Sequence, residues 1–488
     1  MIINLKIVIK MLGIIFLVMG LFLIMPILVS VFYNGADLKS FIYSSLICIA
    51  IGLPFAFIKP SINEIGKREG YLIVTLSWFI MGIAASLPYL FSGTIHTFTS
   101  AFFESVSGLT TTGASVFKDI EILPHGILFW RSLTQWIGGM GIIVLTVAVI
   151  PLLGVGGMQL FGAESPGPTK DKVHPKIKET AKRLWLIYFG LTVLLYLILW
   201  LYSGMTSFDA INHAMTTMST GGFSTKNASI AHWDSPGVQY PIILFMFLAG
   251  SNFTILYYLF KGKFEKVFFN EEFRTYFLGI IIISLIIAFS VICHVNEGIE
   301  KSFRLALFQV VSLVSTTGFV TADYENWSNG LTMAFFMLLF TGACAGSTSG
   351  GIKVVRHLIF FKNSILEFKR LLHPRAILKV KMNGELVSAK VTAHIMVFLL
   401  VYLMVFCIGS ILIMRLNGDL NLPFQTSLGA VASCLGNIGP GLGAVGPVFN
   451  FSVLPESSKF LLSIIMLIGR LELFSVLIIV SPSFWKYN

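Results

Sequence analysis

Charged residues are scarce in this chain of 488 residues: Asp, Glu, Lys and Arg make up 12% of it, whereas 56% is hydrophobic. A soluble protein of this length needs far more surface charge, so the composition excludes an ordinary soluble fold. Cysteine is scarce too, and its five copies lack the short spacings of metal ligands. We therefore expect neither a disulfide nor a metal centre at Cys48, Cys293, Cys344, Cys407 and Cys434.

The hydrophobic residues gather in runs long enough to cross a bilayer, which takes about 20 residues per helix. Six runs qualify: 9–33, 39–58, 71–93, 184–203, 275–294 and 391–414. Backbone polar groups in lipid need internal partners, so these runs are predicted to be helices. The first run exceeds signal-peptide length and has no small-residue cleavage site before the next run, so we expect it to remain as a span.

Lysine and arginine cluster in alternate loops, most densely at 170–183 and 353–390. Placing these clusters in the cytoplasm predicts ten spans with both termini inside. The net charge of +11 is then an orientation signal and not a nucleic-acid-binding surface. Many acidic residues fall outside on this assignment. They indicate either a mildly acidic vestibule that concentrates cations or solvated loop charges without a role.

One pattern occurs four times, which is the strongest feature of the sequence. Each copy starts with Phe, continues through about three helical turns and breaks at a Thr/Ser/Asn-x-Gly element. The Phe-to-Gly spacings are 15, 14, 15 and 15 residues, ending at Gly113, Gly222, Gly318 and Gly439. The copies are 98–115 (FTSAFFESVSGLTTTGAS), 208–224 (FDAINHAMTTMSTGGFS), 303–320 (FRLALFQVVSLVSTTGFV) and 424–441 (FQTSLGAVASCLGNIGPG).

Each copy lies between a long apolar run and a second apolar stretch, at roughly 124–154, 236–260, 326–362 or 457–481. The copies are too short and too polar to span a bilayer alone, so we predict re-entrant loops around one pore. A ring of backbone carbonyls can replace the hydration shell of potassium, and glycine leaves room in the ion path. A single Gly-Thr element is more often a helix-packing site, but four in register favour a pore.

Two further features are predicted at membrane depth. Residues 342–351 (GACAGSTSGG) make a poor continuous helix. Because they lack a Gly-Lys-Ser/Thr ending and a preceding strand, they do not form a phosphate-binding loop. We expect an unwound loop below the ring of carbonyls, which we call the selectivity filter. Arg470 lies within the last apolar stretch, where a charge is costly and therefore a functional candidate. The alternatives for Arg470 are an ion pair with Glu472 and snorkelling to the interface.

At these residues the chain resembles the Trk/Ktr/HKT superfamily of cation transporters, over residues 71–488. The matching segments are TTTGAS at 110–115, STGGFST at 219–225, STTGFVT at 315–321 and GNIGPGLG at 436–443. The resemblance implies potassium-selective uptake, with K⁺ as the transported ion and no organic cofactor, because a glycine stands at 113. The fourth loop departs from the threonine-rich pattern, so carbonyls are expected to coordinate there without hydroxyls.

The resemblance implies two sets of site residues. The potassium-binding filter comprises Thr111, Thr112, Gly113, Thr220, Gly221, Gly222, Thr316, Thr317, Gly318, Asn437, Ile438 and Gly439. The gate comprises Gly346, Ser347, Thr348, Ser349, Gly350 and Arg470. It also implies a homodimer in the bacterial inner membrane and a cytoplasmic ring of nucleotide-binding regulatory subunits.

The predicted fold is an all-α membrane protein with four pseudo-symmetric helix/re-entrant-loop/helix repeats and an N-terminal two-helix extension. The expected divisions are an extension at 1–60, repeat 1 at 71–160, a basic linker at 161–183, repeat 2 at 184–263, repeat 3 at 272–362, a basic linker at 363–390 and repeat 4 at 391–488.

Two other classes of membrane protein fit the sequence less well. A secondary transporter built from inverted repeats would need an odd number of spans per repeat, and an intramembrane enzyme would need His and acid pairs at membrane depth. His213, in the second copy, is better explained by packing. Passive flow, proton symport and sodium symport all fit the sequence.

Overall fold

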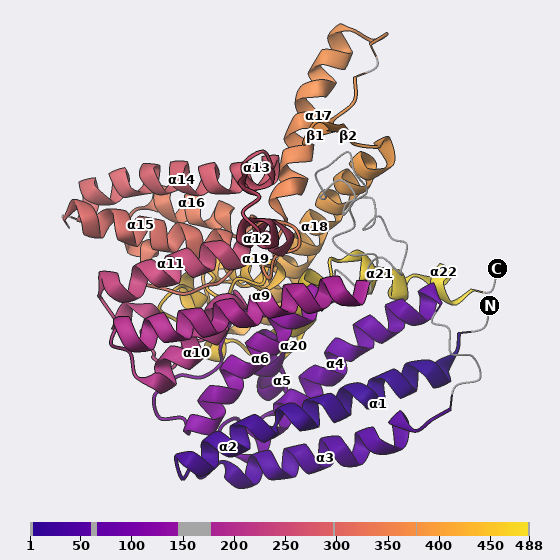
Figure 1. The fold of residues 1–488 in the computed structure, drawn as a ribbon, viewed down its shortest axis with the longest axis vertical. Helices are drawn as coiled ribbons and strands as arrows, with labels where there is room; N and C mark the ends of the chain where they lie inside the picture. The colour runs from indigo at the N-terminus through magenta and orange to yellow at the C-terminus, as the bar shows by residue number, and fades with distance from the viewer. Residues whose placement is uncertain (1–2, 60–65, 145–176, 296–297, 377, 487–488) are drawn as a thin grey trace.

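The computed structural model describes residues 3–59, 66–144, 177–295, 298–376 and 378–486. The predicted linker at 161–183 therefore lies mostly outside the described residues. The fold is helical, with one two-stranded hairpin, β1 (Lys381–Met382) and β2 (Glu385–Leu386), among the described residues. Figure 1 shows the helices packed into one body, from which α17 (Val354–Leu372) extends.

The six predicted spans are all present. Helices long and apolar enough to cross a membrane occupy Leu5–Phe32, Leu38–Ala56, Arg68–Phe91, Ala181–Tyr202, Glu271–Cys293 and Ala389–Leu416. They correspond to α1 (Leu5–Phe22) with α2 (Ile24–Phe32), α3 (Leu38–Ala56), α4 (Lys67–Phe91), α9 (Ile177–Leu197) with a π-helical turn, α14 (Glu271–Val295) and α18 (Ala389–Leu416). The predicted all-α membrane fold is confirmed.

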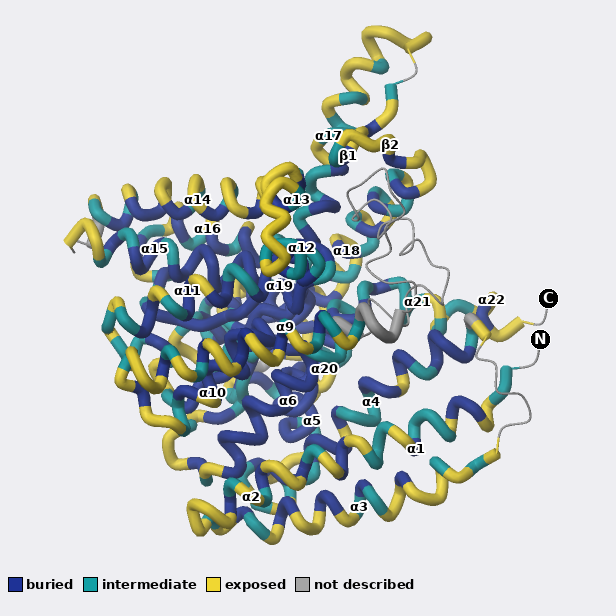
Figure 2. The backbone as a smooth tube through the Cα atoms, in the orientation of Figure 1, coloured by how far each residue is buried: buried dark blue, intermediate teal, exposed yellow. Residues whose placement is uncertain are grey.

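A short, largely buried helix follows the first span of each repeat, and in Figure 2 the labels of two of them, α5 and α19, stand near the dark blue centre of the molecule. They are α5 (Phe98–Leu109), α10 (Ser207–Met218), α15 (Ile299–Val314) and α19 (Phe424–Gly436). We call them the pore helices. Thr97 and Thr206 cap α5 and α10 by accepting backbone N–H groups. Each pore helix ends directly before its Thr- or Asn-containing turn, so its partly negative C-terminal end points at that turn.

The second helix of each repeat differs from a simple span. Repeat 1 has one helix, α6 (His125–Val144), followed by residues outside the described set. Repeat 2 has α11 (Pro236–Gly250) and α12 (Phe253–Phe260) at 110°, and repeat 4 has α20 (Glu456–Arg470) and α21 (Phe474–Val480) at 116°. Repeat 3 has α16 (Asn329–Leu338), an unwound segment and α17.

The apolar stretches at 236–260 and 457–481 are therefore each made of two helices that meet at a sharp bend. After α11, Asn252 starts a new helix by accepting the Thr254 N–H at 2.7 Å. The Gly250 carbonyl left free by the break accepts the backbone N–H of Cys344 at 3.0 Å. After α20, Glu472 and Leu473 both have positive φ, of 55° and 53°, which ends the helix. Counting each bent pair as one span, the described residues hold up to eight apolar spans, and the count of ten stays a prediction.

The two ends of the chain lie on the same side of the fold. Ile7 at the start of α1, Tyr71 at the start of α4 and Phe484 in α22 (Pro482–Trp485) share one buried apolar cluster. At the other end of the extension, the Asp37 carboxylate accepts the backbone N–H of Ile127 at 2.9 Å. This bond joins the extension to the beginning of α6. The remaining short helix, α13 (Phe264–Phe268), precedes α14.

Candidate functional site: a four-part ring and the loop beneath it

The turn after each pore helix has the same backbone conformation in all four repeats. Thr111, Thr220, Thr316 and Asn437 have positive φ, between 53° and 57°, and the glycines two residues later have φ of 82°, 79°, 78° and 108°. These are Gly113, Gly222, Gly318 and Gly439. Glycine adopts such angles without a steric penalty, so a glycine suits this position of each turn.

The four glycines form a closed ring. A Cβ atom on each would lie within 3.0 Å of a carbonyl oxygen of the next repeat, closer than real side chains approach. The contacts are Gly113 with Gly221, Gly222 with Thr317, Gly318 with Ile438 and Gly439 with Thr112. Each carbonyl belongs to the residue before the next repeat's glycine, and the fourth contact returns to the first repeat. The turns therefore surround one axis in chain order.

One cavity of about 160 Å³ opens on this ring and is lined by all four glycines. The charged residues that line this cavity are Lys118, Arg131 and Lys226, so of the two alternatives for the acids, an acidic vestibule is not what this cavity shows. Two of the acids that the sequence assigned to the outer side bond other protein groups. Glu121 pairs with Lys226 at 3.6 Å, and Glu325 accepts the Gly443 N–H at 2.8 Å. Burial, with Asp323 nearby, raises the pKa of Glu325.

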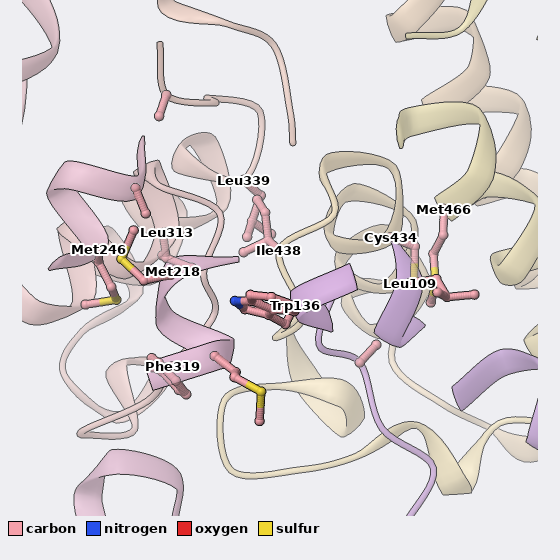
Figure 3. Close-up of a cluster of buried hydrophobic side chains, with 14 of the residues drawn as sticks. Leu109, Trp136, Met218, Met246, Leu313, Phe319, Leu339, Cys434, Ile438 and Met466 are labelled. Atoms are coloured by element: carbon pink, nitrogen blue, oxygen red, sulfur yellow. The ribbon is translucent and has the colours of Figure 1, made fainter. Parts of the chain in front are cut away.

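Ten of the twelve predicted filter residues are buried, and Gly113 and Gly222 are partly exposed. The side chains of Thr111, Thr112, Thr220, Thr316, Thr317, Asn437 and Ile438 have no exposed surface. The fourth repeat departs from the others as its sequence suggested. Asn437 donates its amide to the Thr112 hydroxyl at 3.0 Å, so it bridges repeats 4 and 1. Figure 3 shows large apolar residues from all four repeats packed nearby, including Leu109, Met218, Leu313 and Ile438.

Residues 341–353 form an unwound segment, as the sequence predicted for 342–351, and none of them lines the cavity on the ring. Thr341 and Ile352 pair as an isolated parallel bridge, which closes the segment into a loop. Gly346 and Gly351 have φ of 70° and 65°. Ser347, Thr348, Ser349 and Gly350 are buried. We call this segment the intramembrane loop.

The loop contacts several repeats just before their filter glycines. Thr348 donates its hydroxyl to the Met218 carbonyl at 3.2 Å and accepts from the Thr220 hydroxyl at 3.3 Å. The Gly350 N–H donates to the Thr316 hydroxyl at 2.7 Å. A Cβ on Gly350 would meet the Gly436 carbonyl within 3.0 Å. The loop therefore lies directly against the inner ends of repeats 2, 3 and 4.

Arg470 reaches the same place from the end of α20. Its guanidinium is buried and donates to the Thr348 carbonyl at 2.8 Å and to the Gly138 carbonyl of α6 at 3.5 Å. The two alternatives fail: Glu472 bonds Arg356 at 2.6 Å instead, and the buried guanidinium does not snorkel. The predicted gate residues are thus brought together, with repeat 1 joined through Gly138.

A buried ion pair that the sequence patterns did not predict joins Glu104 in α5 to Arg131 in α6 at 2.9 Å. Gln135 was not predicted either, and its side-chain amide donates to the Gly221 carbonyl at 2.6 Å. Charged residues inside segments assigned to membrane depth were the available signal for the pair. Within the described residues, no group of three or more His, Cys, Asp or Glu side chains is arranged to hold a metal ion.

The comparisons with known proteins agree with this architecture. Residues 38–487 match the family described as TrkH, cation transport protein. The Trk system potassium uptake protein TrkH of Escherichia coli K12 is 40% identical over 95% of this chain and 96% of its own length. TrkG of the same organism is 35% identical, over 98% and 99%.

A solved structure resembles the whole chain. The crystal structure of the potassium transporter TrkH from Vibrio parahaemolyticus has a TM-score of 0.90 and 35% identity, covering 99% of this chain and all of that one. The family's proteins are transporters and not enzymes. Sequence profile, relatives and fold agree, and the chain belongs to the TrkH family of cation transport proteins.

Proposed function

We propose that this protein takes up potassium ions across the cytoplasmic membrane of a bacterium through one selective pore. The observation that carries the proposal is the closed ring of Gly113, Gly222, Gly318 and Gly439, each next to a carbonyl of the following repeat. Backbone carbonyls of suitable number replace the hydration shell of K⁺. The twelve filter residues predicted from the sequence are the proposed ion ligands. The curated relatives named above are potassium uptake proteins.

Uptake of rubidium-86 into proteoliposomes tests this function. We expect uptake that excess potassium suppresses and that equal sodium leaves nearly unchanged. Sodium-22 entering as fast as rubidium would contradict the proposed selectivity. Imposing proton and sodium gradients separately distinguishes passive flow from symport, because only a coupling gradient drives rubidium above its equilibrium distribution.

The intramembrane loop and Arg470 are the proposed gate. Support comes from the contacts of Thr348 and Gly350 with the inner ends of three repeats, together with the Arg470 bond to the Thr348 carbonyl. On this proposal, the loop and the arginine occupy the ion path below the ring. A fixed positive charge at that depth opposes a cation electrostatically. Gly346, Ser347 and Ser349 complete the loop.

The proposed regulator is a cytoplasmic, nucleotide-binding subunit ring that docks on the face bearing α17. Lys353, directly before α17, donates to the Ser349 hydroxyl of the loop at 3.0 Å, and Arg356 in its first turn bonds Glu472 beside the α20–α21 bend. A force on α17 would therefore reach both parts of the gate. Both termini are proposed to be cytoplasmic, and the protein is proposed to be a homodimer.

A further inference from the structure

One register of the pore helices carries a polar side chain in three of the four repeats. The position nine residues before the filter glycine is Glu104 in α5, His213 in α10, Gln309 in α15 and Ala430 in α19. All four residues are fully buried. Because the register is the same in each helix, the four side chains face equivalent parts of their repeats. That part is the limb of the loop that returns outward after the filter glycine, which we call the returning limb.

Each polar side chain bonds its own returning limb. Glu104 accepts the Val116 N–H at 2.8 Å and the Ser115 hydroxyl at 3.1 Å. His213 Nε2 lies 2.9 Å from the Ser224 hydroxyl. Gln309 donates to the Ala322 carbonyl at 3.1 Å. These bonds connect a rigid helix to the otherwise irregular backbone just outside the filter.

The fourth repeat has no such side chain and packs its limb directly. A Cβ on Gly429, next to Ala430, would lie within 3.0 Å of the Leu442 backbone nitrogen. Small residues at this register therefore let the limb rest on the helix itself. Taken together, the four repeats indicate that the residue nine positions before the filter glycine holds the returning limb in place. It does so by hydrogen bonding in three repeats and by close packing in the fourth.

Repeat 1 is distinguished by charge. The Arg131 guanidinium pairs with Glu104 at 2.9 Å, donates to the Ser115 hydroxyl at 3.1 Å and donates to the Ser224 carbonyl of repeat 2 at 3.1 Å. It also lies 4.1 Å from the ring centroid of Phe223. One ion pair thus fixes the returning limbs of two adjacent repeats.

The same helix reaches the filter backbone itself. Gln135, four residues after Arg131, donates to the Gly221 carbonyl at 2.6 Å and accepts the Phe223 N–H at 3.1 Å. The Gly221 carbonyl is the one that contacts Gly113 in the ring. The separation of repeats 1 and 2 at the ring therefore depends on how α6 is held against α5.

We infer that Glu104 and Arg131 are positioning residues for ion selectivity, which rests on the proposed potassium function. They hold the returning limbs of repeats 1 and 2 apart at the spacing that suits K⁺. Sodium, being smaller, is coordinated well only if carbonyls move inward. A buried pair with all its bonds made resists that movement, since displacing one partner leaves a buried charge unpaired.

The test uses two nearly isosteric or charge-keeping variants. Glu104→Gln replaces an acceptor oxygen by a donor toward Arg131, and Arg131→Lys keeps the charge but loses the forked bonds to Ser115 and Ser224. In proteoliposomes, each is expected to raise the sodium-to-rubidium flux ratio about tenfold, the scale of one lost charged hydrogen bond. The KM for rubidium is expected to rise as well.

Glu456→Gln is the matched control. Glu456 pairs with Lys459 at 3.1 Å and accepts the Ser100 hydroxyl at 2.8 Å, at the outer end of the same helix α5. The change weakens an ion pair within α20 (Glu456–Arg470) that is bonded to the first turn of α5, at the end of α5 away from its filter turn, so the flux ratio is expected to stay at the wild-type value.

The outcomes separate the two proposals. A wild-type protein that does not prefer rubidium over sodium overturns the proposed function. A selective wild type with both variants equally selective, or a control that shifts the ratio as much as they do, overturns the positioning role alone. Failure of both variants to reach the membrane also counts against it, because a folding role would then explain the pair.

Discussion

Alanine at Gly318 is expected to abolish rubidium uptake, with a loss of about a hundredfold or more. The added Cβ would lie within 3.0 Å of both the Ile438 carbonyl and the Pro440 ring. The backbone at Gly318 also has φ of 78°, and holding a non-glycine residue in such a region costs about 1–3 kcal/mol. Both effects act on the ring, so coordination is disturbed while the spans are not. Initial rates of rubidium-86 uptake in proteoliposomes measure the loss.

Gly190 in α9 and Gly279 in α14 provide matched controls. A Cβ at either position meets nothing within 4 Å, and alanine stabilises a helix relative to glycine by about 0.5–1 kcal/mol. Gly190→Ala and Gly279→Ala are therefore expected to transport like the wild type. If Gly318→Ala transports as well as these controls, the ring is not the ion path.

Replacing Arg470 by alanine is expected to raise basal uptake at least about tenfold without a regulatory partner. A unit charge about 4 Å from an ion opposes it by roughly 4 kcal/mol at an effective dielectric constant of 20. The change also frees the Thr348 carbonyl from its bond at 2.8 Å, which loosens the intramembrane loop. Both consequences lower the barrier below the filter, and rubidium-86 uptake by the purified protein measures the increase.

Arg470→Lys separates charge from bonding. Lysine keeps the positive charge but cannot reproduce the two bonds to Thr348 and Gly138. If charge dominates, Arg470→Lys remains near the wild-type rate, whereas equal activation of both variants would assign the effect to bonding. Wild-type uptake by Arg470→Ala, at an unchanged melting temperature, would refute the gating role.

Much of this fold is encoded locally. Apolar runs predicted the six long spans because span length is set by bilayer thickness. The fourfold recurrence of Phe, helix and glycine predicted the pore helices and their turns, and the positive φ at both Thr111 and Gly113 agrees with it. The four glycines within residues 342–351 predicted the unwound loop there.

The two helix bends and the Glu104–Arg131 ion pair were not predicted, because they depend on contacts between residues that are distant in the sequence. Ser251–Asn252 gave a local hint of a new helix start, but the free carbonyl of Gly250 is satisfied only by Cys344, far along the chain. Glu472 and Leu473 have positive φ although neither is a glycine, so their residue types did not indicate the second bend. Glu104 and Arg131 were each visible as charges at membrane depth, yet their pairing across 27 residues required the packing of α5 on α6.

The ring of glycines belongs to a single polypeptide, which has a genetic consequence. In a channel assembled from four identical subunits, one codon change alters every quarter at once. Here each codon alters one quarter, so a graded series with one to four changed glycines can be made and the contribution of each quarter separated. Asn437 in place of threonine is such a one-quarter change, and it left the hydroxyls of the other three quarters intact.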